Sequence, residues 1–389
     1  MSKILMCLIF IIMIFTINVS AKDTSSSSII IDNNTGRILY ENNIHEKKLI
    51  ASTTKIMTAI LAIENTDKNK IVKVGNEILD MYGTNIYIEV GEQIKIEDLI
   101  YGLLLRSGND AAKTLAINTA GTEEDFVKMM NRKAKEIGMN NTTFENPHGL
   151  DDSTKNYSTA YDMALLSQYV SKNKMYMRIS GTKKHSAKTK NKSYLWYNRN
   201  KLLNTYEYCT GGKNGYTPAA GKTLITTAEK GGLNLTAVTL NDPNIYETHK
   251  FLYENIYNKY KNYKIVDKKA FKLNNSVYKG KTYLKNSFIY PLTKSERERI
   301  KTKVIIFNEK EVEDIVGYIQ IKLDNKIIGQ VNIYKVKEKE GKPCSFYTKC
   351  KDYLLDTLKK LKLGLQKSLK PGFVVPIPLE TYKSVSSIL

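Results

Sequence analysis

The sequence predicts an α/β domain with a mainly antiparallel sheet, then a small β domain and an amphipathic C-terminal helix. Hairpin patterns stand at both ends of the first domain, with helical patterns between them. Beyond about Tyr260 the helical period disappears and alternating apolar positions replace it. We therefore expect domains at 22–257 and 258–340, a helix at 345–370, and a tail at 371–389 of unknown role.

Residues 1–21 have the pattern of a secretory signal peptide. Lys3 gives a positive start, 4–17 is a nearly unbroken apolar run, and Val19-Ser20-Ala21 is a small-residue cleavage site. The apolar run is short for a spanning helix, so we expect cleavage; an uncleaved anchor is the alternative. The mature protein is expected outside the cytoplasm, as a peripheral protein on the outer face of the cytoplasmic membrane.

Each element of the first domain follows from a local pattern. A hairpin is expected where 29–31 and 38–40 flank a turn-rich run. A helix is expected to begin at Ser52, because apolar residues follow it at helical spacing. Other helical patterns lie at 96–105, 110–119, 122–137 and 159–171. From 222 to 240 the pattern is that of two strands, with Gly231-Gly232 as the turn.

The second domain is predicted from β patterns alone. Residues 304–307 are rich in β-branched residues, and 319–323 alternate between apolar and polar. A turn at 324–326 precedes a returning strand at 327–333.

The expected C-terminal helix is amphipathic over 349–369. Four leucines lie one or two helical turns apart inside a shell of lysines: Leu354, Leu358, Leu361 and Leu365. Such a helix can lie in the membrane interface with its lysines toward anionic headgroups. A helix packed on its own domain is the alternative. Pro371 and Gly372 end the pattern and few apolar partners follow, which favours the membrane.

Charge and cysteine usage narrow the expected partners. The chain has 60 Lys and Arg against 39 Asp and Glu, a net charge of +21. In a secreted protein the anionic partners are lipid headgroups and wall polymers, and no nucleic acid is expected. Cys209 is expected to be a buried free thiol, while Cys344 and Cys350 are close enough to pair or to stay reduced.

Metal and cofactor chemistry is not expected. No cysteine pair has the spacing of a zinc site. The four histidines lie far apart in the sequence and form no H-E-x-x-H motif: His45, His148, His185 and His249. His148 is expected to be structural, in a Pro-His-Gly turn.

Three short motifs carry the predicted chemistry, in the order Ser52-Thr53-Thr54-Lys55, Ser107-Gly108-Asn109 and Lys213-Asn214-Gly215. Lys55 lies one helical turn after Ser52, so both side chains share a face. Burial lowers the pKa of a lysine, which then can take the proton of the serine hydroxyl. The set predicts acyl transfer through a serine ester. Taken singly, each motif also fits a capping serine or a glycine-rich turn.

The remaining motif residues receive roles in the same reaction. We expect Ser107 to relay a proton to the leaving group and Asn109 to bind a substrate amide. Gly215 lets a substrate backbone approach an edge strand, and Lys213 adds positive charge beside it. The N–H of Tyr216, with that of Ser52, is expected to form an oxyanion hole.

With these motifs, 25–255 resembles the low-molecular-weight penicillin-binding proteins, the serine D-alanyl-D-alanine carboxypeptidases of peptidase family S11. It looks most similar to the Gram-positive branch linked to sporulation. Beyond the motifs, Asn146-Pro147-His148-Gly149-Leu150 and Tyr208-Cys209-Thr210-Gly211-Gly212-Lys213 support the resemblance. The resemblance implies removal of the terminal D-alanine from peptidoglycan stem pentapeptides, acylation by β-lactams, and membrane attachment through the last helix.

One position departs from the family pattern. The family usually has threonine or serine where this chain has Asn214, and the resemblance implies that this hydroxyl binds the substrate carboxylate. We expect Asn214 to change recognition without removing catalysis. A non-catalytic penicillin- or wall-binding protein is one alternative. The other is a β-lactamase-like hydrolase, although 140–160 holds no Glu-x-x-x-Asn element to supply its second carboxylate.

Overall fold

The structure is a computed structural model that describes residues 22–190, 192–273, 278, 282–307, 314–336, 353 and 355–357. The expected signal peptide, Cys344, Cys350, most of the expected amphipathic helix and the tail lie outside the described residues. Within the described part, no helix has the length and apolar character needed to cross a membrane.

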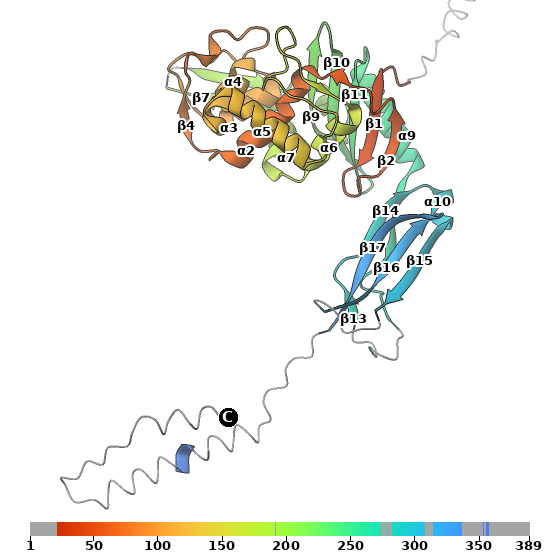
Figure 1. Cartoon of the computed structure of the whole chain (residues 1–389). Helices are drawn as coiled ribbons and strands as arrows, with labels where there is room; N and C mark the ends of the chain where they lie inside the picture. Colours follow the sequence, from red (N-terminus) through yellow and green to blue (C-terminus); the bar gives the residue numbers. More distant parts are fainter. Residues whose placement is uncertain are drawn as a thin grey trace, which may run out of the picture. The chain divides into compact units, whose positions relative to one another are not determined.

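A five-stranded antiparallel sheet organises the first domain (Figure 1). Its order is β2-β1-β11-β10-β9, so that the N-terminal strand β1 lies inside the sheet beside β11, and β9 forms an edge. The strands are β1 (Ser27–Asp32), β2 (Ile38–Asn42), β9 (Cys209–Thr217), β10 (Gly221–Lys230) and β11 (Leu233–Leu240). Both predicted hairpins are confirmed, and Gly231 and Gly232 have the positive φ values that their turn requires.

The sheet is buried on both faces. Because strand side chains alternate, Ile29 and Ile31 join the large core under the helices, while Ile30 joins a second core that includes Leu252 of α9. Most of the helices lie on the first side, and α9 lies on the other (Figure 1). The helices are α2 (Lys55–Asn65), α3 (Ile96–Tyr101), α4 (Asn109–Ala120), α5 (Glu123–Glu136), α6 (Ala160–Ser171), α7 (Lys174–Ser180), α8 (Leu202–Thr205), α9 (Ile245–Lys259) and α10 (Lys294–Glu298).

Two predicted helices begin or end differently. Ser52 lies in a 3-10 turn over Ala51–Thr54, and α2 begins only at Lys55. The helix expected at 96–105 is α3 followed by a π-helical turn at Gly102–Arg106. The wider π turn ends in Ser107, whose left-handed backbone (φ 67°) redirects the chain into α4. Four helices were not predicted from the sequence: α7, α8, α9 and α10.

Short strand pairs complete the first domain. They are β3 (Lys48–Leu49) with β6 (Tyr157–Ser158), β4 (Ile71–Lys73) with β5 (Gln93–Lys95), and β7 (Lys184–Lys188) with β8 (Ser193–Tyr197). The expected thiol, Cys209, is free but half-buried instead of buried, because it stands at the start of the edge strand β9. Burial raises its pKa to about 11.

The chain divides into two compact units. The first comprises 22–267, 286–303 and 320–330, and includes the pair β12 (Lys261–Val266) and β14 (Phe288–Leu292). The second comprises the described residues of 268–285, 304–319 and 331–357. The predicted boundaries at 257 and 340 therefore stay predictions.

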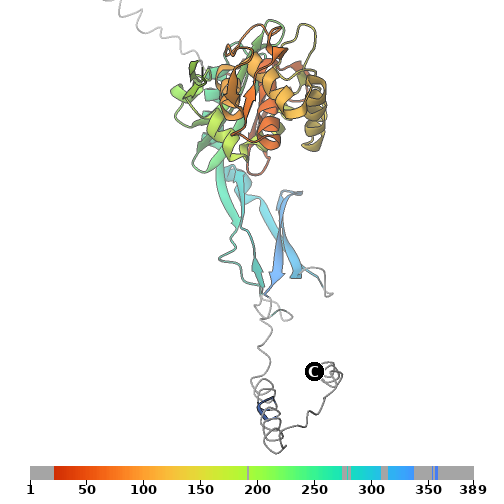
Figure 2. The ribbon, with the colours of Figure 1, turned by 90° about the vertical axis from the view of Figure 1, so that its left-hand side faces the viewer.

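The expected β strands at 304–307, 319–323 and 327–333 are confirmed. A four-stranded sheet has the order β13-β17-β16-β15, and Figure 2 shows its last three strands in cyan to blue. Its strands are β13 (Thr282–Leu284), β15 (Ile300–Ile306), β16 (Ile315–Leu323) and β17 (Lys326–Lys335).

Candidate active site

Ser52 is the partly exposed residue of a turn whose other members are buried. The Thr53 hydroxyl donates to the carbonyl of Ile50 at 2.5 Å, and Ala51 has a positive φ of 46°. A left-handed backbone is strained for a residue with a side chain, so surrounding contacts must hold the turn. The turn presents the Ser52 hydroxyl to the surface at the start of α2.

Lys55 is fully buried and its Nζ makes three hydrogen-bond contacts. Its Nζ lies 3.0 Å from Ser52 Oγ, 2.7 Å from Asn109 Oδ1 and 2.5 Å from the carbonyl oxygen of His148. Burial lowers the pKa of Lys55 well below its usual value; the positive charge of Lys213 lowers it further, and Asp110 opposes both. A neutral amine beside the serine hydroxyl is thereby favoured.

The second motif joins this cluster through Asn109. The Asn109 side chain accepts from Lys55 and donates to the carbonyl of Tyr82 at 2.7 Å. Asp110 accepts from the backbone N–H groups of Ile86, Tyr87 and Ile88, and so fixes the loop that carries Tyr82. Ser107 is buried two residues before Asn109. Asn109 therefore orients Lys55, a role that the sequence reading did not assign to it.

The third motif lies on the edge strand β9. Lys213 is buried and its Nζ donates to the carbonyl of Asn214 at 2.5 Å. Burial, together with the positive charge of Arg199, lowers the pKa of Lys213 to about 7. Side chains alternate along the strand, so Asn214 and Tyr216 point to the other face, half-buried and exposed.

Gly215 brings β9 against the turn that holds Ser52. A Cβ atom at this position would lie 2.8 Å from the Ser52 nitrogen and 2.6 Å from Thr223 Oγ1. Only glycine allows this approach. The strand backbone and the Ser52 N–H therefore meet where the sequence predicted an oxyanion hole.

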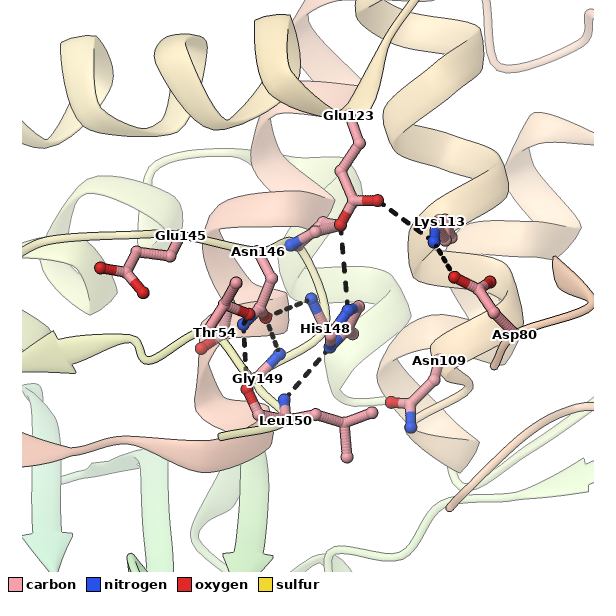
Figure 3. Close-up of polar contacts among 12 residues, drawn as sticks. Thr54, Asp80, Asn109, Lys113, Glu123, Glu145, Asn146, His148, Gly149 and Leu150 are labelled. Carbon is pink, nitrogen blue, oxygen red and sulfur yellow. Dashed lines mark hydrogen bonds and ion pairs between the residues drawn. The ribbon is translucent and has the colours of Figure 1, made fainter. Parts of the chain in front are cut away.

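The turn at Asn146–Leu150, drawn in Figure 3, packs against the segment that carries Ser52 and Lys55. The carbonyl of Pro147 accepts from Thr58 of α2 at 2.6 Å, and the next carbonyl, that of His148, accepts from Lys55. A Cβ atom on Gly149, whose φ is +86°, would lie 2.0 Å from the Ala51 oxygen. His148 was expected to have a structural role, and its backbone carbonyl also contacts Lys55 directly. A pattern of side chains could not predict this contact.

The predicted residues therefore fall into three groups. Ser52, Lys55 and Asn109 are directly hydrogen-bonded. Gly215 packs against the turn at Ser52, and Lys213 acts on Lys55 through its charge. Ser107, Asn214 and Tyr216 border this cluster in the sequence, and their roles stay predictions. Among the described residues, no group of three His, Cys, Asp or Glu side chains is placed to hold a metal.

Comparison with solved structures identifies the structural class of this protein. Penicillin-binding protein 6B from Escherichia coli aligns with a TM-score of 0.64 and 26% identity, over 82% of this chain and 97% of that one. Penicillin-binding protein 5 from Haemophilus influenzae aligns with a TM-score of 0.67 over 82% of this chain and 98% of that one; its 23% identity supports the fold alone. The protein thus has the fold of the penicillin-binding D,D-peptidases.

The sequence defines the family. The sequence model of the D-alanyl-D-alanine carboxypeptidases, peptidase family S11, matches residues 16–244, and the chain belongs to this family. The D-alanyl-D-alanine carboxypeptidase DacF of Bacillus subtilis is 37% identical over 220 residues, covering 55% of this chain and 56% of the relative. DacC of Escherichia coli is 34% identical over 229 residues, covering 54% and 55%. The chain spans about half the length of the curated relatives it matches.

Proposed function

We propose that this protein is a serine D-alanyl-D-alanine carboxypeptidase that removes the terminal D-alanine of peptidoglycan stem pentapeptides and so limits cross-linking. The observation that carries the proposal is the buried Lys55, whose Nζ lies 3.0 Å from Ser52 Oγ. Membership of the S11 family and the relatives named D-alanyl-D-alanine carboxypeptidase support the same reaction. The reaction needs no cofactor.

Lys55 is proposed to be the general base for Ser52. A neutral amine has two N–H donors and one lone pair. Asn109 Oδ1 and the His148 carbonyl accept the two N–H bonds, because neither oxygen can donate. The lone pair is then left for the third contact, the Ser52 hydroxyl. The two acceptors therefore aim Lys55 at the proton that it removes.

When the acyl-enzyme forms, a bond from Ser52 Oγ to the substrate carbonyl carbon replaces the C–N bond to the terminal D-alanine. Ser52 Oγ attacks the carbonyl of the penultimate D-alanine and its proton passes to Lys55. The N–H groups of Ser52 and Tyr216 stabilise the oxyanion. The C–N bond breaks, and Ser107 relays the proton from Lys55 to the departing D-alanine amine, which leaves Lys55 neutral again. Water then attacks the ester with Lys55 as base, which releases the shortened peptide and restores Ser52.

Lys213 and Asn214 are proposed to bind the terminal carboxylate. Lys213 lacks a carboxylate partner among the described residues, and its pKa of about 7 leaves it partly charged at neutral pH. A bound carboxylate favours the charged amine and therefore raises this pKa. A β-lactam presents a carboxylate beside a reactive amide, so the same residues are proposed to accept β-lactams as acylating inhibitors.

We further propose that the protein works outside the cytoplasm, on the outer face of the cytoplasmic membrane. Support comes from the signal-like segment 1–21, the leucine and lysine pattern at 349–369 and the net charge of +21. Deleting 345–389 is expected to release an active soluble protein from the membrane fraction. Unchanged fractionation would point to another anchor, such as an uncleaved signal.

The test of the reaction measures D-alanine release from diacetyl-lysyl-D-alanyl-D-alanine, together with labelling by a fluorescent penicillin. The full chain is expected to release D-alanine and to carry the label on Ser52, whereas Ser52→Ala does neither. Label without D-alanine release would favour the binding-protein alternative. Rapid turnover of a chromogenic cephalosporin would favour the β-lactamase alternative.

A further inference from the structure

The imidazole of His148 closes the turn whose carbonyl holds Lys55 (Figure 3). His148 Nδ1 accepts the backbone N–H of Leu150 at 3.1 Å. The neighbouring Asn146 Oδ1 accepts from the backbone nitrogens of His148 and Gly149. Because Nδ1 is an acceptor, the neutral ring carries its proton on Nε2.

The other end of the ring faces a chain of charges from three segments. His148 Nε2 lies 3.9 Å from Glu123 Oε1 of α5. The second oxygen of Glu123 lies 3.3 Å from Nζ of Lys113 on α4, and Lys113 lies 2.7 Å from Asp80 in the loop before β5. The fourth charged group acting on the ring is Lys55 of α2. The mechanism uses none of Asp80, Lys113 and Glu123.

Resting on the proposed function, we propose that Lys113 keeps His148 neutral by pairing with Glu123, and that neutral His148 is a positioning residue for Lys55. Burial disfavours the charged ring most, Lys55 while protonated and Lys113 act in the same direction, and Asp80 opposes them. Lys113 also pairs with Glu123, the carboxylate that lies 3.9 Å from His148 Nε2.

Protonation of His148 would damage the turn whose carbonyl holds Lys55. The added proton goes to Nδ1, which then cannot accept from Leu150, so the turn loses a hydrogen bond. Burial lowers the pKa of His148 to about 3, and the charges of Lys55 and Lys113 lower it in the same direction. In the native protein the ring therefore stays neutral throughout the working pH range.

Removal of Lys113 weakens this balance, although burial still disfavours the charged ring. Glu123 and Asp80 then face the ring without their cation, and a His148–Glu123 ion pair becomes favourable. The pKa of His148 rises, and mild acid protonates Nδ1 and releases the carbonyl from Lys55. Lys113, which lies far from Ser52 in the sequence, would thus affect the pH at which Ser52 acylation is lost in acid.

The experiment combines two readouts on the full chain: NMR titration of the His148 imidazole, and the pH dependence of Ser52 acylation by a fluorescent penicillin. In native protein, His148 is expected to remain neutral with its proton on Nε2 at about pH 5. In Lys113→Met, the pKa of His148 is expected to rise above its native value, and the acid loss of the acylation rate is expected to begin at a correspondingly higher pH than in native protein. The ring titrates over the same range.

Two further variants isolate the charge from the loss of the side chain. Adding Glu123→Gln to Lys113→Met removes the carboxylate that attracts the proton, so His148 is expected to return to its neutral state and the acid loss to disappear. Lys133→Met is the matched control. Lys133 also contacts two carboxylates, those of Glu64 and Glu136, and its side chain is 18% exposed against 14% for Lys113.

A His148 pKa in Lys113→Met that is no higher than in native protein would overturn the proposal, as would an acid loss that persists in the double variant or also occurs in Lys133→Met. If Lys113→Met does not fold, the single variant Glu123→Gln tests the proposal instead. A raised pKa of His148 in Glu123→Gln would contradict the proposed direction. Native protein that penicillin never acylates would refute the proposed function instead, and the ring titration would still test Lys113.

Discussion

Lys55 and Lys213 are two buried lysines with lowered pKa values, but their surroundings differ. The Nζ of Lys55 contacts three oxygens from three segments, and these contacts fix its direction. Lys213 donates to the carbonyl of the adjacent Asn214, and within the described residues it has no carboxylate partner. The comparison teaches that burial alone does not define a role. A lysine whose amine is fixed by three hydrogen-bond contacts is suited to proton transfer. A lysine whose amine has one such contact can still bind the carboxylate of a substrate.

The largest effect is expected when Lys55 is replaced. Lys55→Met is expected to lower the rate of Ser52 acylation by about 10²–10⁴-fold, the usual contribution of a general base. Stopped-flow or gel-based acylation by a fluorescent penicillin measures the rate, and a thermal melt confirms folding. A folded variant with native acylation would show that Lys55 is not the base.

Replacement of Lys213 is expected to weaken substrate binding more than it slows the chemical step. Lys213→Met takes away one interaction with a charged carboxylate, which contributes about 1.5–3 kcal/mol. We therefore expect kcat/KM on the D-Ala-D-Ala peptide to fall roughly tenfold to hundredfold, chiefly through KM. An equal fall with a substrate whose terminal carboxylate is amidated would contradict this role.

The residue next to Lys213 should have a smaller effect. Asn214→Thr exchanges one neutral hydrogen-bonding group for another, a change of about 0.5–1.5 kcal/mol. The kcat/KM on the peptide is expected to rise by at most about tenfold, with acylation still at Ser52. If the native protein is inactive and the variant is fully active, Asn214 disables the site, and the binding-protein alternative becomes the better one.

The smallest effect concerns pH. Lys55 must be neutral, so kcat/KM rises as pH increases through its pKa; Lys213 must be charged, so kcat/KM falls as pH increases through about 7. Lys213→Arg keeps the charge at high pH and should remove the alkaline fall, which amounts to about twofold at pH 7 and grows above it. An unchanged alkaline limb would assign it to another group.

The sequence predicted the sheet and the chemistry better than the exact geometry. The strands at 29–40 and 222–240 were predictable because apolar alternation and turn residues are local signals. The start of α2 was not, because the positive φ of Ala51 and the Thr53 hydroxyl bond to Ile50 place a 3-10 turn before it. Local composition does not encode such a tertiary constraint.

Helix α9 was missed for a different reason. Its buried face includes His249, whose ring lies between Thr226 and Thr239 at 2.7 and 3.2 Å. A periodicity based on apolar residues passes over a histidine that is buried by hydrogen bonding to a sheet. The contact of Lys55 with the His148 carbonyl was equally hidden, because every residue type has that atom.

The position of β1 has a consequence for how the chain acquires its structure. Ser27 pairs with Leu240, and Asp32 with Leu235, so the first strand finds its main partner only after the whole helical region has been made. Pairing between such distant segments makes folding slow. A chain ending before β10 would keep β1 only in a hairpin with β2, which is marginally stable alone. Chain synthesis must therefore pass residue 240 before the sheet beneath Ser52 can form.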